Sequence, residues 1–582
     1  MENITKKEVA GVLNEIGTLL ELKGENPFKS RAYYNAARTI ETLTEDIGEL
    51  VESGRISQVK GVGEALSEKI TELVSTGHLA YHEKLKEDIP AGLLDMLEIP
   101  GLGPKKVRKI WQQLDITTIG ELEYACQENR LVDLEGFGAK TQQKILDGID
   151  FIKKYQERWL INDVLRAATP LLEYVQDLPQ IIRGRLAGSL RRHAETVKDI
   201  DIVASAEPSD RNAVMEAYVE YPEVKEIIGK GETKTSIRLE SGINADLRLV
   251  DDEQFPYALH HFTGSKAHNT AMRSRAKQRH MKMNEYGLFK DEDELIACSD
   301  EKEIFRALAL HYIPPELREN NGEIEYAAES EIPALVEPAD IRGVLHVHTY
   351  YSDGIPGIKE LVEACQNLGY QYLGITDHSQ SAFYANGLSP ERLREQWEEI
   401  EQLQTELSDF TIFRGIESDI LPDGALDYPE EILEQFDFVI ASVHSNFNLK
   451  ESKQTERIVK AVQNPYTTFL GHPTGRLLLA RDEYAVNLAA VIEAAGEAGT
   501  GIEINANPKR LDLDWRWGRT AKEHGVKVSV NPDAHRLDGL QDIRYGVGIA
   551  RKGWFTREDV VNAWDAGDVS RFFRRKKEQV RT

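Results

Sequence analysis

The spacing of hydrophobic and polar residues changes several times along the 582-residue chain. Residues 1–150 follow the helical period, as short apolar helices interrupted by glycines. Residues from about 159 to 250 mix helices with alternating runs such as DIDIVAS and NADLRLV, which predict an antiparallel sheet. Residues from about 256 to 318 return to helix and loop.

A regular alternation begins after residue 340, where short β runs are separated by amphipathic helices. This order predicts parallel strands joined by crossover helices, and seven such strands favour a barrel. The runs are GVLHVHT, YLGITDH, TIFRGIES, FVIASVH, TFLGHP, GIEINA and KVSVNPDAH. The stretch before them, 319–340, is acidic and interrupted by prolines. We therefore expect it to be an inter-domain linker with at most a docking strand.

The helical first part contains an internal repeat at residues 59–70, 99–110 and 134–145. Each copy has an apolar residue, a Gly-apolar-Gly turn and a helix that carries lysines, which is the helix-hairpin-helix arrangement. Such a turn lets backbone amides approach a phosphate closely, so it binds the DNA backbone rather than a base sequence. The glycines expected to contact DNA are Gly61, Gly63, Gly101, Gly103, Gly136 and Gly138.

Composition limits the class of protein. The length predicts several domains, and 41% hydrophobic with 29% charged residues is typical of a globular protein in water. No apolar run approaches the roughly 20 residues of a membrane span, and the N-terminus has no export signal, so we expect a cytoplasmic protein. Cys126, Cys298 and Cys365 are far apart, which fits a reducing compartment and excludes a thiolate zinc site.

The net charge of −27 has the wrong sign for a protein that simply coats nucleic acid. Its distribution matters more, because residues 254–284 contain six lysines and arginines and no acidic residue. A second cluster consists of Arg183, Arg185, Arg191 and Arg192. Such basic tracks on an acidic body can bind phosphates, although a solvated helix face is the alternative.

Two aspartates one residue apart, Asp199 and Asp201, begin a predicted strand, and Asp246 lies in a neighbouring one. Alternate residues of a strand face the same side, so the three carboxylates can bind two divalent ions, Mg²⁺ or Mn²⁺, for phosphoryl transfer. Gly188 and Ser189, just before them, would offer donors to a triphosphate.

At these residues the chain resembles the family X DNA polymerases, the group of DNA polymerase beta. The segment HFTGS at 261–265, then Asn269, Arg273 and the NEY at 284–286, continue the resemblance, which covers residues 1 to about 318. It implies that Ser189 and Arg192 hold the triphosphate, with help from Arg158. It also implies that Phe262, Gly264 and Asn269 form the sugar and base pocket and that Arg273 senses the template side of the new base pair. The chain departs from the family at His261, where polymerase beta has a tyrosine beside the sugar.

The same resemblance implies a deoxyribose-phosphate lyase in the first domain. Lys69 matches the lysine that would form a Schiff base with the sugar aldehyde. Lys29 and Tyr33 match part of the 5′-phosphate pocket, whereas Ala65 replaces a lysine that contacts phosphate in the family. A solvated helical lysine is the alternative interpretation of Lys69.

The C-terminal part concentrates metal-ligand residues at the ends of predicted strands. His-x-His and Asp-x-His spacings place each pair on one face of a strand end, where barrel enzymes keep their chemistry. Mixed imidazole and carboxylate ligands suit a cluster of two or three zinc, manganese or iron ions that activates water against a phosphate ester. The nine residues are His346, His348, Asp353, His378, Glu417, His444, His472, Asp533 and His535.

These nine residues match the ligand set of the PHP domain, whose fold is a distorted seven-stranded βα barrel, over residues 341–575. The resemblance implies a manganese-dependent 3′-5′ exonuclease and, in places, an abasic-site endonuclease. Four further residues lie near the ligand segments and are candidates for contacts with the DNA backbone: Arg414, Arg476, Asn507 and Arg510.

The expected fold is multidomain, α+β followed by α/β. The domains are a helical DNA-binding domain (1–90), a fingers-like domain with two helix-hairpin-helix motifs (91–155), a nucleotidyltransferase palm of the polymerase beta kind (156–258), a thumb-like domain (259–318), the linker (319–340) and the PHP barrel (341–575).

The expected function is a DNA polymerase that fills short gaps in base excision repair and carries a nuclease in its barrel. Its partners would be gapped or primer-template DNA and deoxynucleoside triphosphates, without a membrane, and the protein would be a monomer. Two alternatives stay open: a barrel that acts as a small-molecule phosphatase or pyrophosphatase, and a DNA-binding scaffold with two inactive sites.

Overall fold

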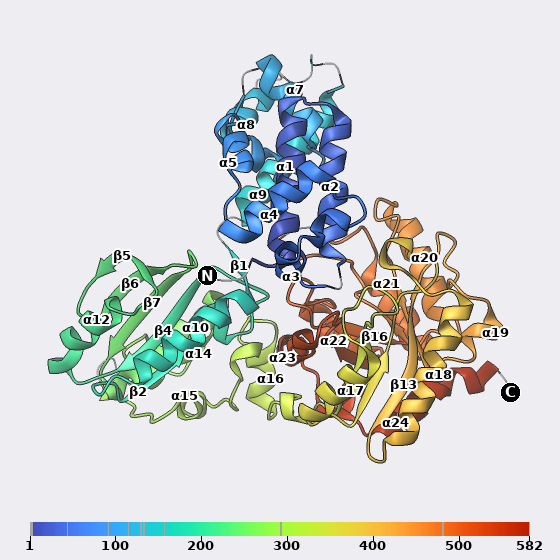
Figure 1. The fold of residues 1–582 in the computed structure, drawn as a ribbon. Coiled ribbons are helices and arrows are strands. Elements are labelled where there is room, and N and C mark those ends of the chain that lie inside the picture. Colours follow the sequence, from blue (N-terminus) through green and yellow to red (C-terminus); the bar gives the residue numbers. More distant parts are fainter. Residues whose placement is uncertain are drawn as a thin grey trace. The chain divides into compact units, whose positions relative to one another are not determined.

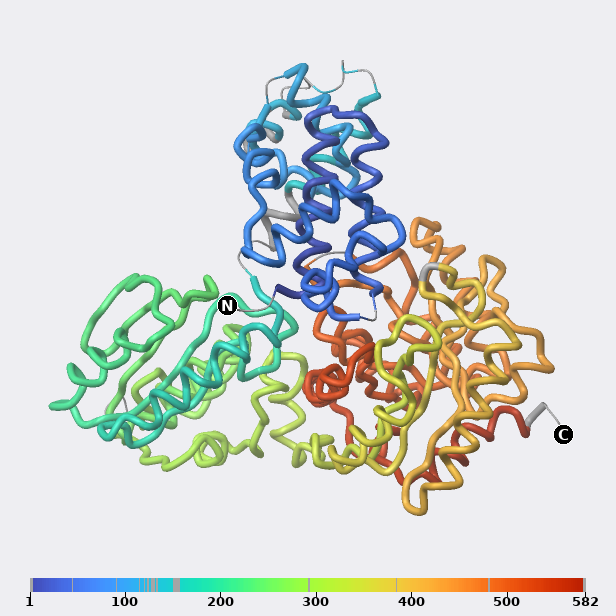
Figure 2. The backbone as a smooth tube through the Cα atoms, viewed as in Figure 1, coloured from blue at the N-terminus to red at the C-terminus, as the bar shows by residue number. Residues whose placement is uncertain are grey.

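The computed structural model describes residues 4–43, 45–90, 92–114, 116–127, 131, 134, 136–155, 158–290, 294–479 and 482–580. The chain forms two compact units, Met1–Glu157 and Arg158–Thr582. Figure 1 shows a helical first unit and a second unit that contains the sheets. Figure 2 follows the same backbone in chain order. No helix of the described ranges has the length and apolar character that crossing a membrane requires.

The first unit is helical, as the sequence predicts, with its own hydrophobic core. A capping box between Thr5 and Glu8 begins the first helix, and Gly24 ends it in the left-handed region at φ 77°. The helices are α1 (Lys6–Lys23), α2 (Pro27–Glu41), α3 (Ile47–Glu52), α4 (Glu64–Thr76), α5 (Ala80–Glu87), α6 (Gly92–Asp95), α7 (Pro104–Leu114), α8 (Ile119–Gln127) and α9 (Ala139–Tyr155).

The second unit begins with a five-stranded sheet of order β2-β4-β7-β6-β5. Its elements are α10 (Ile161–Gln176), β2 (Arg183–Leu186), α11 (Gly188–Arg191), β4 (Asp199–Ser205), α12 (Arg211–Val219), β5 (Val224–Lys230), β6 (Lys234–Leu239) and β7 (Asn244–Val250), with a small pair of β1 (Trp159–Leu160) and β3 (Thr196–Val197) beside it.

The prediction of an antiparallel sheet is wrong for its central pair, because β4 and β7 are parallel. The helix α12 carries the chain across the sheet, and the antiparallel turns from β5 to β6 and from β6 to β7 then bring β7 back beside β4 in the same direction. The other pairs, β2–β4, β5–β6 and β6–β7, are antiparallel as expected.

The segment predicted as helix and loop also contains a three-stranded sheet, β10-β9-β8. Its strands are too short for an alternating pattern to stand out. The elements are α13 (Phe255–Thr263), α14 (Lys266–Gln278), β8 (Met281–Met283), β9 (Leu288–Lys290), β10 (Glu294–Leu295) and α15 (Glu301–Ala307). The stretch predicted to be a linker contains α16 (Glu323–Glu329), and a β-bridge pairs Leu335 with Thr556.

The predicted barrel is present as seven parallel strands in chain order, and an isolated bridge between Val347 and Ala534 links the first strand to the segment that follows the last. The strands are β11 (Gly343–Val347), β12 (Tyr372–Ile375), β13 (Thr411–Asp419), β14 (Phe438–Ser442), β15 (Phe469–Leu470), β16 (Gly501–Asn505) and β17 (Val528–Asn531). The longer helices around them are α17 (Ile358–Asn367), α18 (Pro390–Glu406), α20 (Glu451–Gln463), α21 (Leu488–Ala498), α23 (Ile543–Lys552) and α24 (Ala566–Val580) (Figure 1).

Candidate active sites

Three carboxylates meet on the palm sheet. Asp199 begins β4, Asp201 follows two residues later on the same face, and Asp246 in β7 is the register partner of Asp201. The parallel pairing of β4 with β7 therefore brings all three predicted residues together.

The carboxylates repel one another electrostatically. Burial, together with the charges of Asp199 and Asp246, raises the pKa of Asp201 to about 7. Burial and Asp246 also raise the pKa of Asp199. Lys234 Nζ lies 2.7 Å from Asp246 Oδ2 and offsets part of this charge. A group of ionised oxygens that disfavour one another fits divalent cations, which bind oxygen ligands and neutralise them.

Gly188 packs directly beneath these acids. Its φ is 62°, in the left-handed region, and a Cβ at this position would lie 2.2 Å from Asp201 Oδ2. The main-chain amide of Ala187 donates to the carbonyl of Asp201 at 2.8 Å. Glycine is therefore required here for the turn that carries Ser189 to pass the carboxylate.

The arginines expected at the triphosphate are held by neighbouring segments. Arg192 donates from Nε to Glu319 Oε1 at 3.1 Å and from Nη1 to the carbonyl of Thr263 at 2.5 Å. Arg158 donates from Nε to Thr196 Oγ1 at 2.7 Å, and its charge acts on Asp199.

The predicted sugar and base pocket lies at the end of α13 and the start of α14. Asn269 Nδ2 donates to the carbonyl of His261 at 2.7 Å, and the guanidinium of Arg248 lies 4.1 Å from the ring centroid of Phe262. Gly264 has φ 68°, which favours glycine. Arg273 is exposed on α14.

The three helix-hairpin-helix turns have the same backbone geometry. Their first glycines, Gly61, Gly101 and Gly136, have φ of 88°, 86° and 85°. Their second glycines, Gly63, Gly103 and Gly138, precede α4, α7 and α9, and no described atom lies within 4 Å of where their Cβ atoms would be. Packing inside the protein therefore does not require the second glycine, whereas close approach of an external group would.

The residues predicted for a lyase surround one tyrosine. Lys69 Nζ lies 5.0 Å and Lys29 Nζ 6.0 Å from the ring centroid of Tyr81, and the ring of Tyr33 stacks 6.3 Å from it. Lys69 also donates to the carbonyl of Ala65 at 3.2 Å. The structure thus brings Lys29, Tyr33 and Lys69 together.

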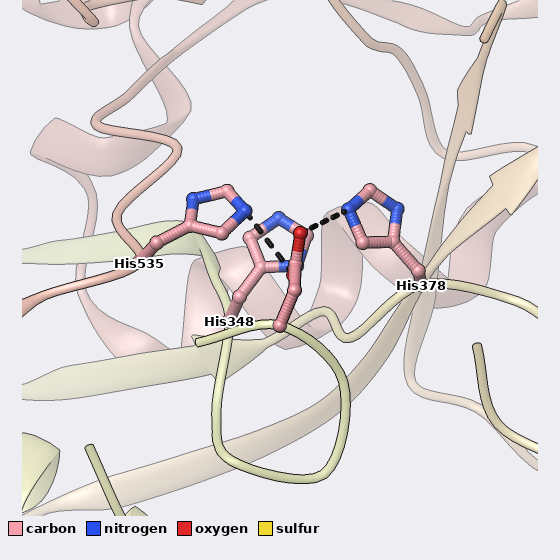
Figure 3. Close-up of side chains that lie close together, drawn as sticks. His348, His378 and His535 are labelled. Carbon is pink, nitrogen blue, oxygen red and sulfur yellow. Dashed lines mark ion pairs between the residues drawn. The ribbon is translucent and has the colours of Figure 1, made fainter. Parts of the chain in front are cut away.

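The nine predicted ligands of the barrel gather at the carboxyl ends of its strands. Three overlapping groups have ligand atoms within 4.8 Å of one another: His348, Asp353, His378 and His535; His346, His348 and Asp533; His378, Glu417 and His444. His472 Nε2 joins them at 3.0 Å from Glu417 Oε1. The carboxylate of Asp353 lies 3.6 Å from His378 Nε2 and 3.3 Å from His535 Nε2. Figure 3 shows the rings of His348, His378 and His535 close together.

The barrel cluster fits metal ions. Neither ring nitrogen of His348, which is fully buried, hydrogen-bonds to any of the described residues, nor does Nε2 of His346. Burial alone would lower the pKa of His346, but Glu503, Asp533 and Glu417 outweigh it and raise this pKa well above its usual value. Buried imidazole nitrogens without a hydrogen-bond partner among those residues, close to several carboxylates, are the kind of donors that transition-metal ions bind.

Comparison with known sequences agrees with this geometry. Residues 4–79 match the profile described as helix-hairpin-helix domain, 93–150 the SAM-like helix-hairpin-helix tandem, 258–319 the DNA polymerase beta thumb and 345–507 the PHP domain. The DNA polymerase/3′-5′ exonuclease PolX of Bacillus subtilis strain 168 is 41% identical over 574 residues, which are 98% of this chain and 99% of that protein. The chain belongs to the PolX family of family X DNA polymerases.

Proteins with another name also resemble part of this chain. A probable phosphatase of Thermoanaerobacter strain X514 is 28% identical over 248 residues, 40% of this chain and 95% of that protein. One of Caldanaerobacter subterraneus is 31% identical over 219 residues, 34% of this chain and 77% of that protein. Each of these probable phosphatases matches only part of this PolX chain.

Two carboxylates that support the ligands of this PolX chain were not found from the sequence. Glu503 accepts from His346 Nδ1 at 2.6 Å and from the amide of His472 at 2.8 Å, and Asp419 lies 2.7 Å from His444 Nδ1. Such partners fix the orientation of metal-binding imidazoles. The available signal was an acid inside an apolar strand, GIEIN.

The four residues considered for DNA contacts lie in different surroundings. Arg510 Nε is 3.5 Å from Asp533 Oδ2, and Asn507 is bonded within its own turn. Arg414 instead pairs with Glu401 at 3.1 Å. Arg476 is half-buried and bonded to Asp514 at 2.6 Å and to the carbonyl of Arg510 at 2.9 Å, so its guanidinium supports the barrel loops.

Proposed function

We propose that this chain extends DNA primers in short gaps at its palm and removes nucleotides from 3′ ends at its barrel. The observation that carries the proposal is the register of β4 and β7, which gathers Asp199, Asp201 and Asp246 beside the Gly188 turn. A second group, of eight clustered ligands with His472 beside Glu417, supports the nuclease.

At the palm, Asp199, Asp201 and Asp246 would hold two Mg²⁺ or Mn²⁺ ions. When bound, such ions activate the attacking 3′-hydroxyl and neutralise the triphosphate. Ser189 and Arg192 would bind and orient the triphosphate, and Phe262, Gly264 and Asn269 would line the sugar and base pocket. His261, which replaces a tyrosine of the family, would lie beside the sugar. Arg273 would lie on the template side of the new base pair.

At the barrel, the nine ligands would hold two or three ions, manganese being the proposed metal. When bound, these supply hydroxide and a clamp for the phosphodiester. Glu503 and Asp419 would keep His346 and His444 oriented. Arg510, which lies beside Asp533, would contact a DNA phosphate.

The partners would be gapped or primer-template DNA and deoxynucleoside triphosphates, in the cytoplasm, with the protein acting as a monomer. The helix-hairpin-helix turns support a DNA substrate because their second glycines leave the backbone open to a phosphate. Abasic-site cleavage at the barrel belongs to the same proposal.

A lyase in the first unit is a second candidate function. The specific support is the gathering of Lys29, Tyr33 and Lys69 about Tyr81. A borohydride trap with a 5′-deoxyribose-phosphate end would link wild-type protein to DNA, and Lys69→Ala would lose that link. Retention of the link in Lys69→Ala would assign any lyase to another amine.

The decisive experiment is a manganese-supplemented assay on a labelled primer-template. We expect Asp199→Ala with Asp201→Ala to lose only extension, and His346→Ala with His348→Ala to lose only 3′ shortening. If shortening survived the histidine changes, the nuclease would not lie in the barrel. A small phosphate ester, supplied in parallel, tests the phosphatase alternative, which preferential cleavage of that ester would favour. Wild-type protein without any extension would favour the scaffold.

A further inference from the structure

The loop that carries Arg192 packs against the barrel within the second unit. A Cβ at Gly548 in α23 would lie 2.3 Å from His193 Nδ1, so glycine is required for this approach. Arg476 of the barrel lies 3.8 Å from Glu195. The barrel therefore contacts the palm directly beside its predicted triphosphate ligand.

Lys552, the last residue of α23, is the centre of this contact. Its side chain is 1% exposed, and its Nζ donates to Glu319 Oε1 at 2.7 Å and to the main-chain carbonyl of Arg192 at 2.9 Å. The ammonium also lies 4.8 Å from the ring centroid of Trp515.

Glu319 joins this lysine to the arginine. The same Oε1 that accepts from Lys552 accepts from Arg192 Nε at 3.1 Å. Burial alone would raise the pKa of Glu319, but Lys552 and Arg192 outweigh it and hold this pKa below its usual value. One ionised carboxylate is thus shared by two cations, of which one belongs to the palm and one to the barrel.

We propose that Lys552 is a positioning residue for nucleotide binding at the palm. It fixes the main chain of Arg192 and balances the charge of Glu319, which leaves the guanidinium of Arg192 available for a triphosphate. Without this lysine, Glu319 would retain Arg192 as its sole cation and would present an uncompensated negative charge to an anionic nucleotide. This inference rests on the proposed polymerase function.

The test is steady-state incorporation of one nucleotide by the full chain. Lys552→Met should raise the KM for the deoxynucleoside triphosphate about tenfold, because a charge-assisted contact is lost, with kcat and 3′ shortening changed less than about twofold. The matched control is Lys576→Met, which removes another buried lysine of the barrel whose ammonium bonds only to barrel groups among the described residues. It should leave this KM unchanged.

A second substitution distinguishes a positioning role of Lys552, which depends on its charge, from a purely structural role at the contact between palm and barrel. Lys552→Met combined with Glu319→Gln should bring KM back to within about threefold of wild type, since the amide still accepts from Arg192 but carries no charge. If Lys552→Met does not fold, Lys552→Gln tests the same point, because it removes the positive charge beside Glu319 but keeps a polar side chain, and KM should rise.

The inference about Lys552 would be overturned by an unchanged KM in folded Lys552→Met, or by a double variant with a KM as high as that of the single variant. Primer extension by the wild-type protein would still support the polymerase function in either case. Absence of extension by wild type would instead overturn the proposed function.

Discussion

Gly188 shows how little space a single position leaves at the palm. Replacement by alanine would place a methyl group 2.2 Å from Asp201 Oδ2 at a φ of 62°. Either the turn or the carboxylate must move, and displacement of a catalytic group by about 1 Å can cost about 100-fold in rate. We therefore expect Gly188→Ala to lower kcat/KM for nucleotide incorporation about 100-fold.

Single-nucleotide incorporation measures this loss. Gly229→Ala is the matched control in the same sheet, because no described atom lies within 4 Å of its Cβ position. A Gly188→Ala enzyme within about threefold of wild type, against the 100-fold expectation, would contradict the role given to this turn.

Glu503 supports two of the predicted barrel ligands through hydrogen bonds. Its carboxylate accepts from His346 Nδ1, the His472 amide and the side chains of Asn505 and Asn531. Glu503→Gln would turn an amide N–H toward one of these donors, and loss of such a partner typically lowers metal affinity about 10- to 100-fold. Competition with a chelator measures the affinity. Glu493→Gln, an exposed change on α21, should leave it unaltered, and equal affinities in the two variants would rule out this role.

The difference between these residues explains what the sequence could predict. His346 and His348 were predicted because their spacing places both at one strand end. Glu503 has no such pattern, since its partners are 157 residues away at His346 and 31 at His472. Contacts of that kind arise only when the barrel closes.

At the scale of elements, the second glycine of each helix-hairpin-helix turn is the informative one. Gly103 has open space around its Cβ position, so Gly103→Ala should fold normally. The methyl group would then obstruct a phosphate at the start of α7, and we expect DNA affinity to fall about fivefold, equivalent to about 1 kcal/mol. Fluorescence anisotropy with labelled primer-template measures the change. Gly11→Ala in α1 is the control, and equal affinities would contradict the phosphate contact.

The sequence predicts where β7 lies along the chain, but not whether it runs parallel or antiparallel to β4. Alternation of apolar and polar residues places Asp246 on a face of the strand, but parallel and antiparallel strands alternate alike. The hairpin of β5 and β6 decides the direction, because it returns the chain to β4. The direction of the barrel strands could be predicted, because a helix between consecutive strands implies parallel pairing.

At the scale of the whole molecule, Glu301 joins the palm to the thumb. It bonds Arg191 at 2.6 Å and Arg318 at 2.5 Å. Burial alone would raise the pKa of Glu301, but the two arginines outweigh it and lower this pKa well below its usual value. A depressed folded pKa contributes stability above the unfolded pKa, about 4.3, and this stability is lost as the pH falls through the folded pKa.

Glu301→Gln should therefore cost about 3 kcal/mol of unfolding free energy at pH 7, because the buried guanidinium of Arg318 and the half-buried one of Arg191 lose their counter-ion. The deficit should shrink as the pH falls below about 4.3. Denaturant titrations across this range measure it. Glu325→Gln, which is exposed, serves as the reference. A deficit that did not depend on pH would contradict the ionic origin.

The close contact between Gly548 and His193 limits which barrels can be joined to this palm, both in protein engineering and in evolution. A chimera that joined this palm to a different nuclease would need a residue without a side chain at one helix position and a lysine four residues later. Few unrelated barrels would satisfy both requirements, so exchange of the two catalytic halves between proteins should be rarer than their joint inheritance.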